Sequence, residues 1–292
     1  MDQNLINTLE SQIRHYAGNA VRYVNSRPLS GGCINNGFEF ITDGGSFFVK
    51  TNSALRYPGM FEAELLGLNL LRATETICLP KPVCAGASED KTFLILEFVS
   101  SAPKSGDYWT DFGQRLAELH QQSNPFFGLN HDNYIGSLPQ SNTQLASLTE
   151  FMITQRFEPL VRQSREQGLV EKGLVLQFEK LYHRLEHLIP DEKPALLHGD
   201  LWSGNVMTAH DGAVCLIDPA VFYGHREAEL AFTTLFGAFP QEFYEAYHFS
   251  FPLEQDWKQR IDLWNIYPLL VHLLLFGSSY YSQISSIVRK YI

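Results

Sequence analysis

Four apolar residues near the start of the chain recur with helical spacing, at Leu5, Ile6, Leu9 and Ile13. An α-helix has about 3.6 residues per turn, so this spacing gathers the four side chains on one face. The pattern predicts an amphipathic helix from about residue 4 to residue 16.

The next segment alternates between short apolar runs and glycine turns. Residues 29–41 are expected to form a strand, a glycine turn and a second strand, and residues 46–50 a third strand. Helical spacing returns from residue 60 to about residue 73 and ends before the prolines that follow. Residues 92–99 are rich in β-forming side chains and predict one more strand.

The remainder of the chain favours helices. Candidate helices span 110–121, 147–167, 174–189 and several aromatic-rich segments from residue 226 onward, and β-like runs near Ala195 and Cys215 interrupt them. The change of character falls after residue 99, at a stretch of serine and proline. The pattern therefore predicts an α+β protein with a small β-rich lobe, residues 1–99, and a larger, mostly helical lobe, residues 100–292.

Composition narrows the class of protein. Of the 292 residues, 45% are hydrophobic, which is enough for a buried core. The spacing of Cys33, Cys78, Cys84 and Cys215 indicates neither a disulfide framework nor a zinc site, so a reducing cytoplasm is expected. The first residues lack the pattern of a secretory signal, and no run of about 18 apolar residues predicts a membrane span. The net charge of −10 disfavours nonspecific binding to nucleic acid.

The strongest chemical signal lies in two polar turns, each preceded by an apolar run. The first reads His198-Gly-Asp-Leu-Trp-Ser-Gly-Asn205, and the second contains Asp218. Phosphoryl transfer from ATP needs a carboxylate to orient and deprotonate the attacking hydroxyl, and oxygen ligands to hold Mg²⁺ on the phosphates. Asp200 is predicted to be the base, Asn205 and Asp218 the metal ligands, and His198 a support of the loop. Plain solvent-facing turns are the alternative, since Asp, Asn and Gly are common turn residues.

These motifs resemble those of the fructosamine kinase family, which is related to aminoglycoside and choline phosphotransferases and more distantly to protein kinases. The HGDxxxxN pattern belongs to the broader group, whereas Trp202 and the stretch Tyr223-Gly-His-Arg-Glu-Ala-Glu229 resemble the fructosamine kinases more narrowly. The resemblance spans nearly the whole chain and implies a protein-kinase-like, two-lobed fold with ATP and Mg²⁺ as cofactors. Glu227 and Glu229 could then hold the catalytic loop or contact substrate, or they could simply begin a helix.

The resemblance also points to nucleotide-binding residues in the N-terminal lobe. Lys50 would bridge the nucleotide phosphates and an acid on the next helix, and Glu64 is the expected partner rather than Glu62. Residues 30–37 form the candidate phosphate-covering loop, in which glycines let backbone amides approach phosphate oxygens, although a plain hairpin turn would look similar. Nucleotide contacts are expected from Gly31, Gly32, Cys33 and Asn35 in the loop, and from Glu97 and Val99 at the end of the strand predicted over 92–99.

Cys33 raises the hypothesis of redox control. A cysteine at this loop position recurs among fructosamine kinases, and an exposed thiol in a glycine-rich turn can be oxidised or can link two chains. Oxidant would then slow catalysis and reductant would restore it. The chain could be a monomer or a redox-sensitive dimer, and an inert small side chain is the alternative reading of Cys33.

Substrate specificity is expected to depend on polar and aromatic residues of the helical lobe. Residues 128–140 resemble a family segment whose polar side chains could meet a sugar, although relatives usually carry a tryptophan where this chain has Ser147-Leu148. The candidate substrate residues are Asn133, Gln140, Trp202 and Glu227. Trp264 and Tyr267 could also offer flat surfaces to a sugar, but aromatics at such spacing more often belong to a core.

The implied reaction is transfer of the γ-phosphoryl group of ATP to a sugar hydroxyl, O3′, of a ketosamine, either free or on a glycated protein lysine. The phosphorylated ketosamine is expected to fall apart and release the amine, which would make this a protein-repair activity. Two alternatives stay open, a phosphotransferase of the aminoglycoside or choline type and a catalytically silent nucleotide-binding module. Against the silent module, Lys50, Asp200, Asn205 and Asp218 are all present.

Overall fold

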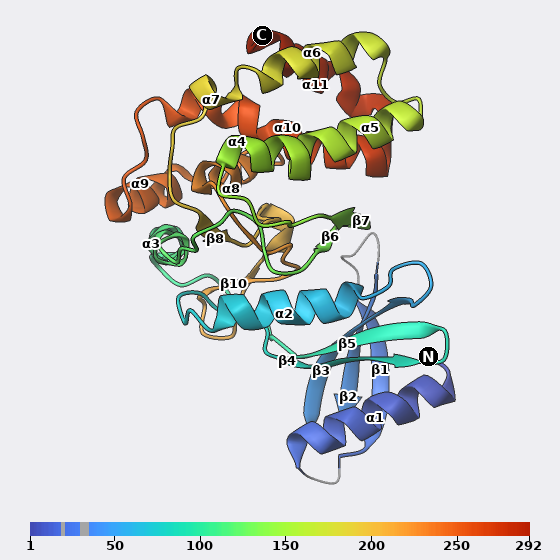
Figure 1. The fold of residues 1–292 in the computed structure, drawn as a ribbon. Helices are drawn as coiled ribbons and strands as arrows, with labels where there is room; N and C mark the ends of the chain where they lie inside the picture. Colours follow the sequence, from blue (N-terminus) through green and yellow to red (C-terminus); the bar gives the residue numbers. More distant parts are fainter. Residues whose placement is uncertain (19–20, 30–34) are drawn as a thin grey trace. The chain divides into compact units, whose positions relative to one another are not determined.

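The computed structural model describes residues 1–18, 21–29 and 35–292 (Figure 1). The chain divides into two compact units, of which the first comprises Met1–Tyr108 and Val206–Pro219. The second comprises Trp109–Asn205 and Ala220–Ile292. Residues 206–219 thus cluster with the N-terminal sheet, so no single cut of the linear chain separates the two units.

A five-stranded antiparallel sheet, in the order β1-β2-β3-β5-β4, is the framework of the first unit. Its strands are β1 Tyr23–Leu29, β2 Asn36–Thr42, β3 Gly45–Ser53, β4 Pro82–Ser88 and β5 Lys91–Glu97. The strand predicted after the glycine loop and the two that follow are confirmed, whereas the strand expected before the loop is misplaced. β1 lies almost wholly before the expected first strand and only ends at Leu29.

The helix α1, Gln3–Ala17, packs on one face of this sheet. Asp2 caps its first turn, because the Asp2 carboxylate accepts a hydrogen bond from the Leu5 amide at 2.8 Å. The predicted apolar stripe of Leu5, Leu9 and Ile13 is buried against residues of β2, β3 and β5. The predicted N-terminal helix is therefore confirmed.

The helix α2, Met60–Arg72, follows β3 and contacts β4 and β5. Successive side chains of a strand point to opposite faces. Val49 of β3 belongs to the core beneath α1, so the next residue, Lys50, points to the opposite face. This alternation directs the Lys50 side chain toward α2, where Glu64 bonds to it.

The sequence pattern does not predict β4. Its residues, Pro-Val-Cys-Ala-Gly-Ala-Ser, are mostly small and have little strand propensity. The strand lies at the edge of the sheet and pairs with β5 alone, with an irregularity between Pro82 and Cys84 that suits a proline at an edge. Pairing with the apolar β5 therefore outweighs the weak local preference.

The second unit is mostly helical and is built around α10, Trp257–Phe276, whose buried residues belong to one large core. Its other helices are α3 Tyr108–His120, α4 Leu148–Phe151, α5 Glu158–Glu166, α6 Lys172–Tyr182, α7 Leu185–Leu188, α8 Arg226–Phe232, α9 Gln241–Ser250 and α11 Tyr281–Lys290. Its short strands pair as β6 Asn133–Ile135 with β7 Leu138–Gln140, and β8 Ala195–Leu197 with β11 Phe222–Gly224. In the first unit, β9 Val206–Thr208 pairs with β10 Val214–Leu216.

Two helices predicted as continuous are interrupted, and in this respect the prediction is wrong. The helix expected over 174–189 divides into α6 and α7, and the one expected over 147–167 contains a π-helical turn, Met152–Phe157. A π-turn accommodates an extra residue and so changes which side chains face inward. Arg156 on this turn is fully buried and donates to the Ser141 carbonyl at 2.6 Å and to Asn142 Oδ1 at 2.7 Å.

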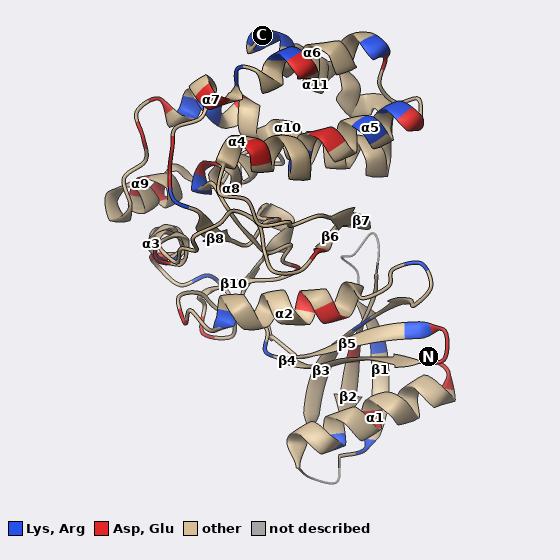
Figure 2. Ribbon diagram, in the orientation of Figure 1, with Lys and Arg blue, Asp and Glu red and all other residues tan. Residues whose placement is uncertain are grey.

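Charged residues of both signs are interspersed along the ribbons of the two units (Figure 2). On α2, Glu62 is exposed while Glu64 is half-buried and paired. Among the described helices, none combines the length and apolar character needed to cross a membrane.

Candidate active site

The loop that carries Asp200 begins at the end of β8 and closes in a 3₁₀ turn, Ser203–Asn205. Nδ2 of Asn205 donates to the backbone carbonyl of Asp200 at 2.8 Å and to Oδ2 of Asp200 at 2.9 Å. These two bonds fix the Asp200 carboxylate, which remains half-buried. Oδ1 of Asn205, the atom that a hard cation would bind, takes no part in these two hydrogen bonds.

Gly199 and His198 set the backbone of the same loop. Gly199 has φ 85°, and a Cβ atom at this position would lie 2.0 Å from the carbonyl oxygen of Ala220, so only glycine fits. The Ala220 amide donates to the His198 carbonyl at 2.9 Å. Nδ1 of the buried His198 accepts from the Asp200 amide at 3.3 Å, so this side chain bonds to the backbone of its own loop.

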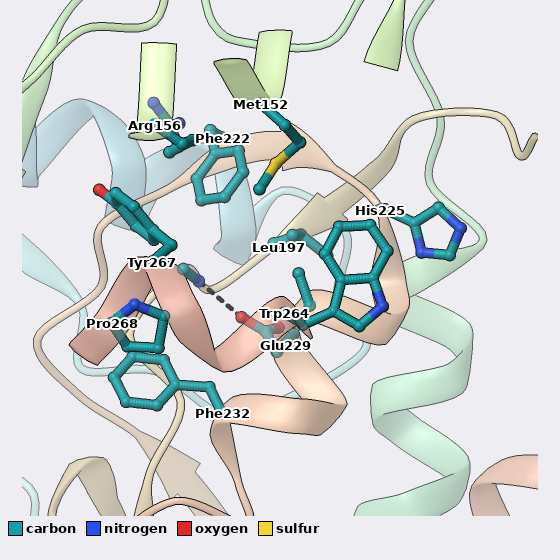
Figure 3. A pocket seen from close by; sticks show the side chains of 12 residues that line it. Met152, Arg156, Leu197, Phe222, His225, Glu229, Phe232, Trp264, Tyr267 and Pro268 are labelled. Carbon is teal, nitrogen blue, oxygen red and sulfur yellow. Dashed lines mark hydrogen bonds between the residues drawn. The ribbon is translucent and has the colours of Figure 1, made fainter. Parts of the chain in front are cut away.

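Glu229 of α8 holds the loop through hydrogen bonds to the loop backbone. Its carboxylate accepts the His198 amide at 3.0 Å and the Gly199 amide at 2.6 Å, the bond drawn in Figure 3. It also lies 2.9 Å from Nε2 of His120, whose Nδ1 lies 2.8 Å from the Tyr247 hydroxyl. Burial alone would raise the pKa of Glu229, but the His120 hydrogen bond and charge and the loop amides lower it, so the carboxylate is ionised.

Replacing Glu229 with glutamine tests this support. The amide group of glutamine has one acceptor oxygen, so at least one loop amide or His120 should lose its partner, at a cost of about 2–4 kcal/mol in unfolding free energy. We expect lower turnover with little change in affinity for ATP, measured by urea unfolding and by steady-state kinetics. Replacing the exposed Glu242 with glutamine is the matched control. Wild-type stability and turnover in the Glu229 variant would contradict this role.

Glu227, proposed from sequence as a possible substrate residue, is occupied within the second unit. Its carboxylate accepts Arg260 Nε at 2.7 Å, Arg260 Nη2 at 2.6 Å and Trp264 Nε1 at 3.0 Å. Glu227 and Trp264 are both buried. The structure thus favours a role in fastening α8 to α10 over contact with a substrate.

Asn133 and Gln140 are likewise paired inside the second unit. Asn133 Nδ2 donates to the Val221 carbonyl at 2.8 Å, and Gln140 Nε2 donates to Asn133 Oδ1 at 2.7 Å. The Tyr267 hydroxyl donates to Gln140 Oε1 at 2.6 Å. These buried bonds hold the β6–β7 hairpin against the segment after Pro219. Asn133 and Gln140, which were expected to contact the substrate, therefore support the fold.

Trp202 differs from the other candidate substrate residues, because its ring is only half-buried. It meets the Phe236 ring edge-on at 5.9 Å between centroids. A Cβ atom on Gly204 would lie 2.2 Å from the Trp202 ring, so the glycine lets the indole pack across the loop. Of the four candidate substrate residues, Trp202 is the most exposed to solvent, and it lies two positions after Asp200 in the chain.

A small cavity in the second unit is lined by Gly199 of the loop and by Glu229, Trp264 and Tyr267, among others (Figure 3). Its volume is about 30 Å³. Sites for small-molecule ligands usually measure several hundred Å³, whereas this volume suits one or two water molecules. The cavity is therefore part of the support of the loop and not a site for a sugar.

His225, which precedes α8, gives a pH-dependent term to stability. Burial lowers the pKa of His225 to about 4, whereas an unfolded histidine titrates near 6.5. Between these values the unfolded chain binds more protons than the folded one, so stability falls as pH drops from about 6.5 to about 4.

Replacing His225 with asparagine should flatten this dependence by up to about 3 kcal/mol, because asparagine does not titrate. Asparagine can still accept the Glu227 amide, which donates to His225 Nδ1 at 3.2 Å. Urea unfolding of both proteins across this pH range measures the difference. Parallel stability curves would show that His225 is not responsible.

In the first unit, Lys50 joins two carboxylates. Its Nζ lies 2.6 Å from Oε1 of Glu64 and 2.7 Å from Oδ1 of Asp218. Lys50 is 4% exposed. Burial alone would lower the pKa of Lys50, but the charges of Asp218 and Glu64 outweigh it and raise the pKa, so the ammonium is retained. The structure therefore makes the predicted pair of Lys50 with Glu64 and adds Asp218.

Asp218 follows β10 in a strained backbone conformation. Its φ is 56°, in the left-handed region that non-glycine residues seldom adopt. Such a conformation costs on the order of 1–3 kcal/mol and is found most often at functional sites. Its side chain remains 40% exposed although one oxygen bonds Lys50, which leaves room for a second ligand.

The other predicted nucleotide residues lie around the same sheet. Asn35 accepts a hydrogen bond from Asn52 of β3 at 3.2 Å. The Glu97 amide donates to the Lys81 carbonyl at 2.8 Å, and Val99 lies just past the end of β5. The predicted contacts of Gly31, Gly32 and Cys33 fall outside the described residues.

A family model for fructosamine kinase matches residues 5–292 of the chain. The chain belongs to the fructosamine kinase family. A probable ketoamine kinase of Synechocystis is 37% identical over 288 residues, which cover 97% of this chain and 95% of that protein. A chloroplastic protein-ribulosamine 3-kinase of Oryza sativa subsp. indica is 38% identical over 282 residues, which cover 94% and 81% of the two chains.

Solved structures agree with this assignment. A candidate fructosamine-3-kinase from Thermobifida fusca superposes with a TM-score of 0.86 at 34% identity, over 97% of this chain and 98% of that one. A spectinomycin phosphotransferase has a TM-score of 0.60 at 15% identity, over 97% and 93% of the chains, and this likeness concerns the fold alone. The predicted kinase-like α+β fold and the family resemblance are both confirmed.

Part of the support of the loop in this fructosamine kinase family member was not predicted from the sequence. For Glu229, holding the loop was one of three roles left open, and no role was predicted for His120 or Tyr247. His120 and Glu229 are 109 residues apart in the chain, so no local pattern connects them. His120 lies near the end of the helix predicted over residues 110–121, and a histidine at such a position is too common to identify a role.

Proposed function

We propose that this member of the fructosamine kinase family transfers the γ-phosphoryl group of ATP to a sugar hydroxyl, O3′, of a ketosamine. The ketosamine would be a fructosamine or ribulosamine, either free or on a glycated lysine. The names of the relatives support this substrate class, since they include a probable ketoamine kinase and a protein-ribulosamine 3-kinase. The observation that carries the proposal is the Asp200 carboxylate, held by Asn205 and by a loop that Glu229 supports.

Asp200 is the proposed base. Its carboxylate is half-buried and oriented by Asn205 Nδ2, as a group that must accept a proton from an attacking hydroxyl should be. Trp202, two positions further along the loop, offers a partly exposed ring on which a sugar could lie.

Each unit holds residues of the kind that bind a magnesium nucleotide. Among the described residues, no group of three or more His, Cys, Asp and Glu side chains could hold a metal ion alone. Mg²⁺ on ATP usually takes one or two protein oxygens and completes its shell with phosphates and water. We propose that Asn205 Oδ1 and the Asp218 carboxylate supply the protein oxygens, and that Lys50, kept cationic by Glu64, binds the phosphates.

An assay of magnesium-ATP turnover tests the proposal. The substrates are ribulosyl-lysine and fructosyl-lysine, compared with an aminoglycoside and choline, and the Asp200→Asn variant reports background ATP hydrolysis. We expect turnover of at least one ketosamine and release of its amine afterwards. Turnover of the aminoglycoside or choline alone would move the protein to that substrate class, and ATP binding without any turnover would favour a silent nucleotide-binding module.

A further inference from the structure

Two cysteines of the first unit meet where the segment after α2 runs beside β10. Cys78 and Cys215 form an isolated parallel bridge, and the Leu216 amide donates to the Cys78 carbonyl at 2.9 Å. Neighbouring strands lie about 4.8 Å apart, which is within the range of about 4.4–6.8 Å between the Cα atoms of a disulfide. The two thiols also form a hydrogen bond with each other. Bridge and thiol contact together place the sulfurs where a covalent bond can form.

The two thiols differ in access to solvent. Cys78 is exposed, whereas Cys215 is fully buried. The hydrogen bond with Cys78 and burial raise the pKa of Cys215, so its thiol stays protonated until a partner reacts with it. A dissolved oxidant can therefore reach Cys78 first, and Cys215 is the thiol in position to resolve the product.

We propose that Cys78 and Cys215 are a peroxide-reactive pair that closes to an intrachain disulfide. The Cys78 thiol first loses its proton to solvent, and the thiolate attacks one oxygen of hydrogen peroxide. The O–O bond breaks, Cys78 sulfenic acid and hydroxide form, and the hydroxide takes up the released proton to become water. The sulfur of Cys215 then attacks the Cys78 sulfur, so the S–S bond forms, the S–O bond breaks, and the hydroxyl leaves as water with the Cys215 proton. In total, two thiols give up two electrons and two protons, and one peroxide becomes two water molecules.

A cross-link between Cys78 and Cys215 would connect the segments that carry the two carboxylates bound to Lys50. Cys78 follows α2, which carries Glu64, and Cys215 lies in β10, shortly before Asp218. Glu64 and Asp218 are the two carboxylates bound to Lys50. The disulfide would tie together the segments that carry them, and it would do so without Cys33. Its formation is also independent of which substrate the protein phosphorylates.

The Cys33→Ser, Cys84→Ser double variant isolates the pair, because the chain has only four cysteines. After treatment of the folded protein with hydrogen peroxide, we expect the intact mass to fall by two hydrogen atoms. Iodoacetamide added after unfolding in urea should label two thiols in untreated protein, none in peroxide-treated protein, and two again after dithiothreitol. We also expect the melting temperature to rise by about 4 °C or more, because the cross-link constrains a long loop of the unfolded chain.

The matched control adds Cys215→Ser to the double variant. Cys78 should then stop at the sulfenic acid, which dimedone traps, with no loss of two hydrogens and no rise in melting temperature. Peptide mapping of peroxide-treated wild type should show Cys78 joined to Cys215, which covers the case in which the double variant folds poorly. Two alkylatable thiols after peroxide, over-oxidation of Cys78 with Cys215 still free, or disulfide-linked dimers would each overturn the proposal.

Discussion

Replacing Asp200 with asparagine is expected to lower turnover by on the order of a hundredfold or more while ATP affinity stays close to that of the wild type. The carboxylate is the proposed proton acceptor, and an amide cannot take the proton of an attacking hydroxyl. Asparagine retains the shape of the side chain, and its Oδ1 can still accept the hydrogen bond that Asn205 Nδ2 now gives to Asp200 Oδ2 at 2.9 Å. The loop should therefore keep its conformation. Initial rates with saturating ATP and ribulosyl-lysine measure the effect.

A control separates loss of the base from loss of a negative charge. Asp191 precedes β8, is exposed, and should tolerate asparagine without a change in turnover. Urea unfolding and ATP titration should give the same results for both variants and the wild type, because neither change removes a buried bond. A turnover of Asp200→Asn within a few fold of the wild type would exclude Asp200 as the base, whatever the substrate.

The parts of the site that could be predicted are those in which short stretches of sequence carry the chemistry. The HGD turn contains the proposed base, a histidine that accepts the amide of that residue, and a glycine that no other residue can replace at φ 85°. Lys50 and Glu64 were paired on the family resemblance, and Glu62, two residues from Glu64, was set aside because it points to a different face of the helix. The pair is present at 2.6 Å.

The parts that could not be predicted depend on contacts between distant segments. Arg156 faces inward because of a π-turn, which adds a residue to a turn without any signature in a pattern of apolar spacing. The strand β4 forms because β5 offers it a partner, although its own residues prefer no strand. Likewise, the meeting of Cys78 with Cys215 is a consequence of residues 206–219 clustering with the N-terminal sheet.

The candidate substrate residues show why a role inferred from a family resemblance has to be checked against the structure. Asn133, Gln140 and Glu227 are polar residues in stretches that resemble family motifs, and this made them candidates for contact with a sugar. Buried polar groups must find hydrogen-bond partners, and these three find them inside the second unit. A polar residue in a buried loop therefore indicates a supporting network as readily as a binding site. Only Trp202 keeps accessible surface among the four candidates.

Replacing Asp218 with asparagine should weaken the dependence on magnesium as well as turnover. Asparagine tolerates the left-handed conformation at φ 56°, so the backbone should be retained, but the neutral amide is a poorer ligand for a hard cation. We expect the magnesium concentration for half-maximal rate to rise by about tenfold or more, and turnover to fall by a similar factor. Lys50 keeps Glu64 as a partner at 2.6 Å, so the unfolding free energy should change much less than the kinetics.

Titration of rate against magnesium at fixed ATP, for the wild type and the variant, measures this effect directly. Replacing Asp211 with asparagine is the matched control, because this exposed acid lies in the turn between β9 and β10 and so removes a charge from the same hairpin. Binding of ATP without metal should be equal or tighter in the Asp218 variant, since a negative charge near the phosphates is lost. An unchanged magnesium requirement, together with weaker metal-free ATP binding, would instead assign Asp218 to holding Lys50 in place.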